Sequence, residues 1–480
     1  MPLFHGEAEV DDVHLYDVKL NTKDLVEAAA IRGSVAELGL DSHSTDLKNG
    51  LAVVNKALLR DADLTVVLAD SVAEDTTTSE LVDWRIRVDD IELQHVKAMV
   101  MLAPQVDSAC VIVEIGSAHA NAFLDLGKEI YQVDQLDVAG TRVGYDLLNM
   151  PNLPEQLDPN HLLFEDVCLT MDSFVYKGTQ EMELMLTKFA ANEHTGFVIA
   201  DANGRVEMDS LALSLPKFTV TTGDSRLMFA YRMDMNAFDE FSPGKFSFLG
   251  EGQIGKEDMI YFTRMGGEGT RDVCTMMSER LPALPSVLQV KAEGNLKAVN
   301  VERLYLDVPE LATLEGGAEL FDVAGNMSLL ANIGVRDVHE GTVDVEGTFD
   351  MADETYAAQM FFDSLVVNHY VALEDTAVFS GKASVQGEGL DFFSPHTVVQ
   401  AVASLSDSRF GKIDLDNIQT DVTLKGQQLL ANVLCDNSQL QVQLKLDTEL
   451  QKHLIDGSLD LDVPLVDIQG MGFSEERMQA

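Results

Sequence analysis

The chain has 480 residues, of which 46% are hydrophobic and 7% aromatic, and a formal net charge of −47. That length is enough for about three ordinary domains, and so large an acidic excess argues against binding to nucleic-acid phosphates. The longest apolar runs are too short for a transmembrane helix, and the first residues lack a signal-peptide pattern.

The first third of the chain is predicted to form consecutive strands. These cover residues 10–20, 30–40, 51–59, 62–68, 81–100, 110–115, 118–126 and 129–138. The polar segment 70–79 and the proline-containing segment 150–161 are predicted to be loops.

Residues 84–100 contain the most informative pattern, in which apolar and polar residues alternate but the phase shifts twice. The shifts fall at Asp89-Asp90 and at Gln94-His95. This pattern is typical of a long strand bent at a bulge, or of two strands joined at a tight polar corner. A shift keeps the apolar residues on either side of it on one face of the sheet.

The same bent phrase recurs along the chain at irregular spacing. Further copies begin at Val10, Val133, Phe164, Met208 and Val301, with weaker ones at Phe362 and Leu415. The irregular spacing argues against a strict-period solenoid.

The second half of the chain is predicted to contain strands and a few helices. Strands are expected within residues 162–231, 245–249, 286–350 and 412–469. Residues 256–265 fit a short helix or a strand, and residues 270–281 have helical character.

The clearest helix signal covers residues 394–405. Ser394 is a suitable cap, and Pro395 then occupies the first helical position. Val398, Val399, Val402 and Leu405 follow at helical spacing, although three of these four are β-branched. We expect this helix to lie on or at the mouth of a groove.

No catalytic or metal-binding constellation is apparent. The cysteines, Cys110, Cys168, Cys274 and Cys435, are too far apart for a CxxC site, and their disulfide state stays open. Residues 250–255 match GxGxxG, but without a surrounding βαβ pattern a glycine-rich hairpin corner is favoured over a nucleotide site. We therefore expect a protein that is not an enzyme and uses neither cofactor nor metal.

The bent strands and glycine turns resemble those of the TamB and AsmA-like family of Gram-negative cell envelopes. The phrases that carry the resemblance lie at residues 10–22, 176–178, 192–196, 204–211, 255–258 and 293–297. The resemblance implies an all-β fold, a long, curved, mostly antiparallel sheet that forms an open groove (a β-taco) with one or two short helices. It also implies a single continuous array over residues 1–480, as a fragment without the N-terminal membrane anchor and the C-terminal barrel-docking domain.

By this resemblance the full-length protein is periplasmic, anchored in the inner membrane, and moves phospholipid to the outer membrane. An alternative is a scaffold that lends a strand edge to outer-membrane proteins, with a BamA-like barrel as partner. A closed solenoid acting as an adhesin or polysaccharide enzyme is a third hypothesis.

The pattern supports the groove, because a sheet with one apolar face must cover that face and few helices are predicted. The predicted lining residues come from three copies of the bent phrase. They are Trp84, Ile86, Val88, Ile91 and Leu93; Val206, Met208, Leu211, Leu213, Leu215 and Phe218; and Val299, Val301, Leu304, Leu306 and Val308.

Overall fold

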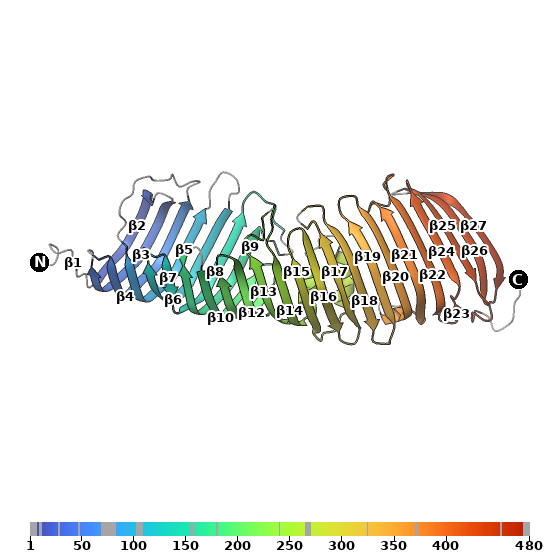
Figure 1. Ribbon diagram of the computed structural model, residues 1–480, viewed down its shortest axis with the longest axis horizontal. Coiled ribbons are helices and arrows are strands. Elements are labelled where there is room, and N and C mark those ends of the chain that lie inside the picture. Colours follow the sequence, from blue (N-terminus) through green and yellow to red (C-terminus); the bar gives the residue numbers. More distant parts are fainter. Residues whose placement is uncertain are drawn as a thin grey trace. The chain divides into compact units, whose positions relative to one another are not determined.

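The computed structural model divides by its contacts into two compact units (Figure 1). The first unit comprises Met1–Met235 with Glu257–Thr275, and the second comprises Asn236–Lys256 with Met276–Ala480. The single array predicted for residues 1–480 stays a prediction. The structure describes residues 7–8, 12–26, 29–46, 49–68, 83–101, 109–153, 157–158, 160–178, 181–239, 241–264, 270–323, 325–369, 373–451 and 454–473.

The strands of the first unit pair side by side and are mostly antiparallel. Among the described strands β4 and β5 are the one parallel pair, and β7 and β8 share the same two neighbours, β6 and β9. The strands are β1 (Glu7–Ala8), β2 (Asp12–Val26), β3 (Ala29–Asp46), β4 (Leu51–Leu68), β5 (Arg85–Met101), β6 (Ala109–Asp125), β7 (Ile130–Val133), β8 (Leu136–Leu147), β9 (His161–Lys177), β10 (Glu181–Glu193), β11 (Val198–Met208), β12 (Ala212–Thr221) and β13 (Arg226–Asp234).

The strands of the second unit pair antiparallel throughout the described part. They are β14 (Phe246–Ile254), β15 (Ser286–Gly294), β16 (Ala298–Val308), β17 (Ala312–Phe321), β18 (Ser328–Asp337), β19 (Thr342–Asp350), β20 (Thr355–Val366), β21 (Ala377–Glu388), β22 (Val398–Phe410), β23 (Ile413–Asp414), β24 (Ile418–Lys425), β25 (Gln428–Asp436), β26 (Leu440–Gln451) and β27 (Leu454–Val466). The predicted all-β class, with a curved and mostly antiparallel sheet, is confirmed.

The described helices are short. α1 (Lys256–Arg264) and α2 (Arg271–Arg280) fall where helical character is expected, and η4 (Val367–His369) is a single 3₁₀ turn. α1 has acidic residues in its first turn and Arg264 in its last, an arrangement that the helix dipole favours.

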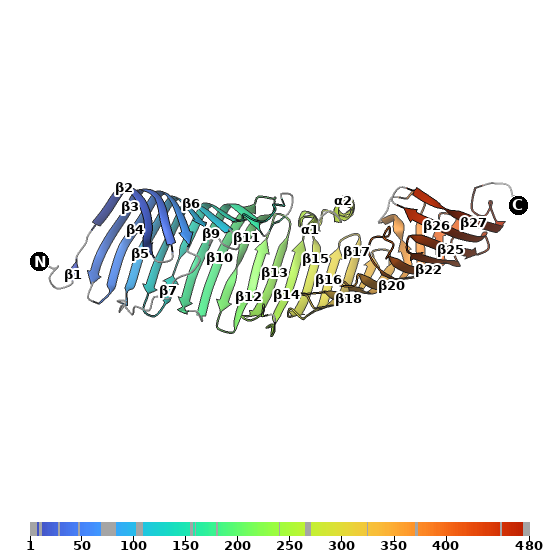
Figure 2. The ribbon, with the colours of Figure 1, turned by 90° about the horizontal axis from the view of Figure 1, so that it is seen from above.

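The strands of the first unit bend without ending. Residues 51–59 with 62–68 form one strand, β4, and residues 110–115 with 118–126 form another, β6, so the prediction of separate strands was wrong. Asp61 in β4 and His95 in β5 have left-handed backbone conformations, with φ of 49° each. They lie in equivalent positions of neighbouring strands, because the residues on either side of them are paired. Figure 2 shows these strands curving over.

The helix predicted at residues 394–405 is absent. Ser394 and Pro395 lie in a turn, and Val398 begins β22, which pairs with β21 and β24. β-branched residues lose side-chain freedom in a helix, whereas the two neighbouring strands here supply backbone hydrogen bonds. Val399 faces one side of the sheet and Val402 the other, where it is 50% exposed.

One further prediction, for the glycine-rich segment 250–255, is wrong, and two others fall wholly or partly outside the described residues. Residues 250–254 continue strand β14 and are followed by α1, so the expected hairpin corner is wrong, and the next strand, β15, is antiparallel. The predicted loop at residues 70–79 and the first bent phrase at Val10 lie wholly or partly outside the described residues.

Candidate functional site

One face of the first unit is lined by rows of apolar side chains that cross its strands. Residues paired directly across a ladder point to the same face of a sheet, so the register identifies each row. One row contains Val13, Leu40, Ala57, Ile91, Ala120, Leu136, Met171, Leu186, Gly204, Phe218 and Phe229. A neighbouring row contains Ala52, Ile86, Leu124, Tyr131, Tyr176, Met182, Met208, Leu213 and Met233. We call this side the groove face and the opposite side the outer face.

The groove face is the inner side of the bend. Val35, Ala62 and Val96 form a buried cluster of three neighbouring strands, next to the left-handed residues. Leu59 and Leu64, which lie before and after the bend of β4, both pack against it. Side chains from both arms can meet only on the concave side.

The second unit continues the same design with shorter strands. Rows again cross the sheet, and one contains Leu306, Leu314, Val335, Val343, Phe362, Gly381, Leu405, Ile418, Cys435 and Val442. Another contains Val301, Ala318, Ala331, Gly347, Ala358, Val385, Ala401, Val422, Ala431, Leu446 and Leu459. Each unit therefore has its own apolar face.

The rows are open rather than covered. Away from the bend most of their side chains are only half-buried, and within the described part of the chain the strands make their extensive contacts with lateral neighbours. A half-buried apolar face of this length is available to an apolar ligand.

Most of the predicted lining residues share the groove face. In β5, Asp89-Asp90 form a bulge opposite a single residue of β6, so Val88 and Ile91 point the same way. Glu302-Arg303 do the same for Val301 and Leu304 in β16. Ile86, Leu93, Val206, Met208, Leu213, Leu215, Phe218, Val299 and Leu306 lie on the same faces by register, Trp84 directly precedes β5, and Val308 ends β16 in a buried position. Their role in lipid binding stays a prediction.

One predicted lining residue, Leu211, and one predicted phase shift, at Asp209-Ser210, do not lie where the sequence pattern indicated. Leu211 lies in the hairpin between β11 and β12 and is 71% exposed. Asp209-Ser210 belong to that hairpin, in which the Asp209 carboxylate accepts hydrogen bonds from the Leu211 and Ala212 amides, at 2.8 Å each. The actual bulge of β12 is at Pro216-Lys217, between Leu215 and Phe218. A polar pair within an apolar alternation fits a tight turn as well as a bulge, which explains the error.

Glycines opposite aromatic residues are a feature that the sequence patterns missed. Tyr356 is paired with Gly387, and a Cβ at Gly387 would lie 2.6 Å from the Tyr356 ring. Phe218 is paired with Gly204 in the same way, with a separation of 2.6 Å. Each ring lies over the backbone of its paired glycine, in the space that a side chain there would fill. The ring therefore projects less far from the groove face at these points.

α1 covers the ends of strands in the first unit. Tyr261 stacks on Phe197, with ring centroids 5.3 Å apart, and its hydroxyl is 2.7 Å from Thr195 Oγ1. Burial raises the pKa of the Tyr261 hydroxyl. Glu193, 2% exposed, accepts a hydrogen bond from the Thr195 amide at 2.7 Å and pairs with His194 Nδ1 at 2.5 Å. Thr195 therefore links Tyr261 of α1 to Glu193 at the end of β10, which holds the helix against these strands.

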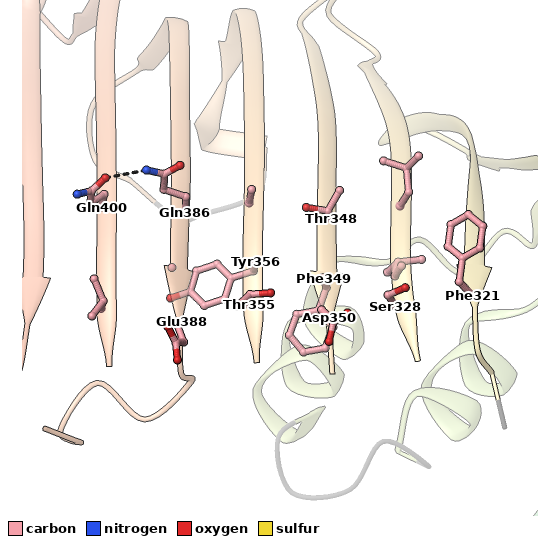
Figure 3. Close-up of a pocket in the computed structure, with 15 residues that line it drawn as sticks. Phe321, Ser328, Thr348, Phe349, Asp350, Thr355, Tyr356, Gln386, Glu388 and Gln400 are labelled. Atoms are coloured by element: carbon pink, nitrogen blue, oxygen red, sulfur yellow. Dashed lines mark hydrogen bonds between the residues drawn. The ribbon is translucent and has the colours of Figure 1, made fainter. Parts of the chain in front are cut away.

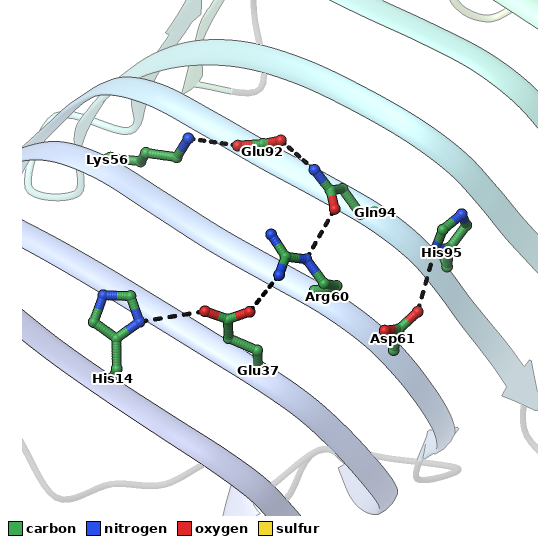
Figure 4. Close-up of polar contacts among 8 residues, drawn as sticks. All are labelled: His14, Glu37, Lys56, Arg60, Asp61, Glu92, Gln94 and His95. Carbon is green, nitrogen blue, oxygen red and sulfur yellow. Dashed lines mark hydrogen bonds and ion pairs between the residues drawn. The ribbon is translucent and has the colours of Figure 1, made fainter.

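Polar contacts across strands stabilise the outer face (Figure 4). Arg60 bridges Glu37, at 2.6 Å, and Gln94, at 2.9 Å. Lys56 pairs with Glu92 at 2.5 Å, which lowers the pKa of that carboxyl. The outer face is thus polar where the groove face is apolar.

No group of three or more potential metal ligands is present in the described part of the chain, and the four cysteines, all described, are free thiols. No helix in the described ranges combines the length and apolarity needed to cross a membrane.

Comparison of the chain with protein-family models, curated proteins and solved structures finds no match.

Proposed function

We propose that the groove face binds the acyl chains of lipids and guides them along the sheet. The observation that carries this proposal is the set of unbroken apolar rows, concave in the first unit and open to solvent. Each methylene transferred from water to such a surface contributes about 0.8 kcal/mol, so a long acyl chain binds without a specific polar contact.

The resemblance to the TamB and AsmA-like family extends this proposal. It suggests a phospholipid cargo, a periplasmic location with an inner-membrane anchor, and a role in outer-membrane biogenesis. The bulges and bends support the resemblance because they produce the curved, one-sided sheet that this family is expected to have.

The lateral extent of the rows suits an acyl chain. Adjacent strands lie about 4.8 Å apart, so the row through Ile91, which crosses from β2 to β13, is on the order of 50 Å long. Glycines and alanines leave shallow depressions in the apolar surface, whereas leucines and aromatic rings provide the area that an acyl chain contacts.

The test is Leu213→Asp in β12. Leu213 is half-buried on the groove face between Met208 and Met233. A carboxylate there places a charge against the acyl path, which costs several kcal/mol if the charge is desolvated. Ser214→Asp is the matched control, because the neighbouring residue of the same strand faces outward beside Arg232.

Bound lipid is measured by mass spectrometry of the purified protein and by fluorescence of a polyene fatty acid added to delipidated protein. We expect Leu213→Asp to lose lipid and probe binding while Ser214→Asp retains both. If the parent binds neither lipid nor probe, the proposal that the groove face binds acyl chains is wrong. The strand-edge scaffold then becomes the better hypothesis. Equal binding by both variants would also contradict the groove.

A further inference from the structure

The second unit has a trough on its outer face, away from the apolar rows (Figure 3). Strands β17 to β22 line a cavity of about 800 Å³. A neighbouring hollow of about 410 Å³ shares five lining residues with it, Leu330, Thr348, Ala357, Gln386 and Gln400. We call the two together the outer trough.

Register explains why the trough exists there. Leu330, Thr348, Ala357, Gln386 and Gln400 form one row across β18 to β22. The row has the short side chains, Thr348 and Ala357, on β19 and β20, between Leu330 on one side and Gln386 and Gln400 on the other. The depression is therefore a consequence of residue size along a single row.

The trough presents an unused hydrogen-bonding pair. Gln386 Nε2 donates to Gln400 Oε1 at 2.7 Å. An amide group has both donor and acceptor capacity, so the Gln400 NH₂ and the Gln386 carbonyl remain available at the two opposite ends of this bonded pair (Figure 3). Along one edge of an extended peptide, N–H and C=O groups are both presented, so such a peptide can accept a hydrogen bond from Gln400 and donate one to Gln386.

Charge selects against anions. Asp350 and Glu388 lie in the next row, on β19 and β21, and are both directly paired with Thr355 of β20. No lysine or arginine is among the residues that line the two cavities, and the chain carries a net charge of −47. A phosphate or carboxylate ligand is repelled, whereas a basic ligand is attracted.

Apolar side chains complete the lining. Phe321, Leu330 and Val398 lie in or beside the rows that contain these polar groups, and Phe321 is 44% exposed. A ligand that fits the trough therefore combines positive charge, apolar groups and peptide-like hydrogen bonding.

We propose that the outer trough binds an extended peptide segment with basic and apolar side chains. The site is separate from the groove face, because most of its lining side chains, those of the rows through Thr348 and Asp350, project from the opposite face of the sheet. Lipid binding and peptide binding can thus fail separately.

The test uses the full chain and a short fluorescein-labelled peptide of alternating lysine and valine, followed by anisotropy at about 0.1 M salt. Ala357→Trp fills the floor of the trough and is expected to weaken binding at least about tenfold. Gln419→Trp, at an exposed outer-face position of β24 that does not line the trough, is the matched control and should bind as the parent does.

Two more conservative variants test the same proposal in case the tryptophan variants do not fold. Glu388→Gln removes one exposed carboxylate and should lower affinity about threefold, whereas Glu251→Gln on the outer face of β14 should not. Equal binding by all variants would mean diffuse attraction to an acidic protein and would overturn the proposal. Binding of a neutral glucose trisaccharide in place of the peptide would overturn it too.

Discussion

β5 bends at His95, a residue with a left-handed backbone conformation, and replacing it by valine tests whether this residue holds the bend. A left-handed conformation costs an ordinary L-residue roughly 1–2 kcal/mol, and a β-branched one more. The hydrogen bond between His95 Nδ1 and Asp61 Oδ1 is 3.1 Å long and exposed, so it contributes less than about 1 kcal/mol. The parent His95 already bears the left-handed cost, so His95→Val adds only the extra strain of a β-branched residue and the loss of this contact. We expect it to lower the free energy of unfolding by about 1–2 kcal/mol.

His95→Asn and His95→Gly separate backbone strain from the loss of the hydrogen bond with Asp61. Asparagine tolerates the left-handed region, and glycine adopts it freely, so both should lose less than about 1 kcal/mol. Arg85→Val, at an exposed position of β5 with ordinary backbone, is the control for a new valine on this strand. Val96 lies next to the bend, so amide hydrogen exchange at Val96 together with thermal unfolding is the assay. If His95→Val proved as stable as His95→Asn, the left-handed corner would not hold the bend.

Three further predictions concern packing and pH. Val96→Ala, at the buried bend, should cost about 2 kcal/mol, and Val100→Ala, on the open half-buried part of the same strand, about half as much by denaturant unfolding. The hydrogen bond from Lys97 lowers the pKa of the Glu114 carboxyl from 4.5. Its contribution is therefore present above pH 4.5 and lost as the pH falls below that value, so Glu114→Gln should flatten this part of a stability–pH curve. Burial, and then a hydrogen bond with a neighbouring carboxyl, raises the pKa of Asp224 from 3.8. Its stabilising effect is complete below pH 3.8 and lost as the pH rises through the folded value, so Asp224→Asn should melt higher than the parent at pH 7 but not in acid.

Strand content and the orientation of the apolar face were predictable because both depend on local alternation. The shift at Asp89-Asp90 correctly indicated a bulge, since a two-residue polar insertion preserves the apolar face on both sides. The same pattern at Asp209-Ser210 belongs to a hairpin. Local sequence does not distinguish the two cases, because the difference depends on whether the following strand continues or reverses.

Features that depend on register across several strands could not be predicted. The Ser394-Pro395 signal for a helix was outweighed by the hydrogen bonds that β21 and β24 offer to β22. The outer trough arises from the sizes of residues in different strands, such as Thr348 and Ala357. Their alignment is set by the ladder and not by their spacing in the chain.

The parallel pair of β4 and β5 has a consequence for how such a protein changes length. In an antiparallel meander the chain direction alternates, so removing or adding one strand reverses every strand beyond it and moves all later hairpins to the opposite edge. Length then changes in steps of two strands, or about 10 Å. Leu51 and Arg85, the first residues of β4 and β5, are paired in register, so the alternation skips one step there. With β7 and β8 counted as one position because both pair with β6 and β9, the positions from β5 onward run opposite to the alternation that β2 to β4 set. A two-strand insertion on either side of the pair preserves the direction of every later strand.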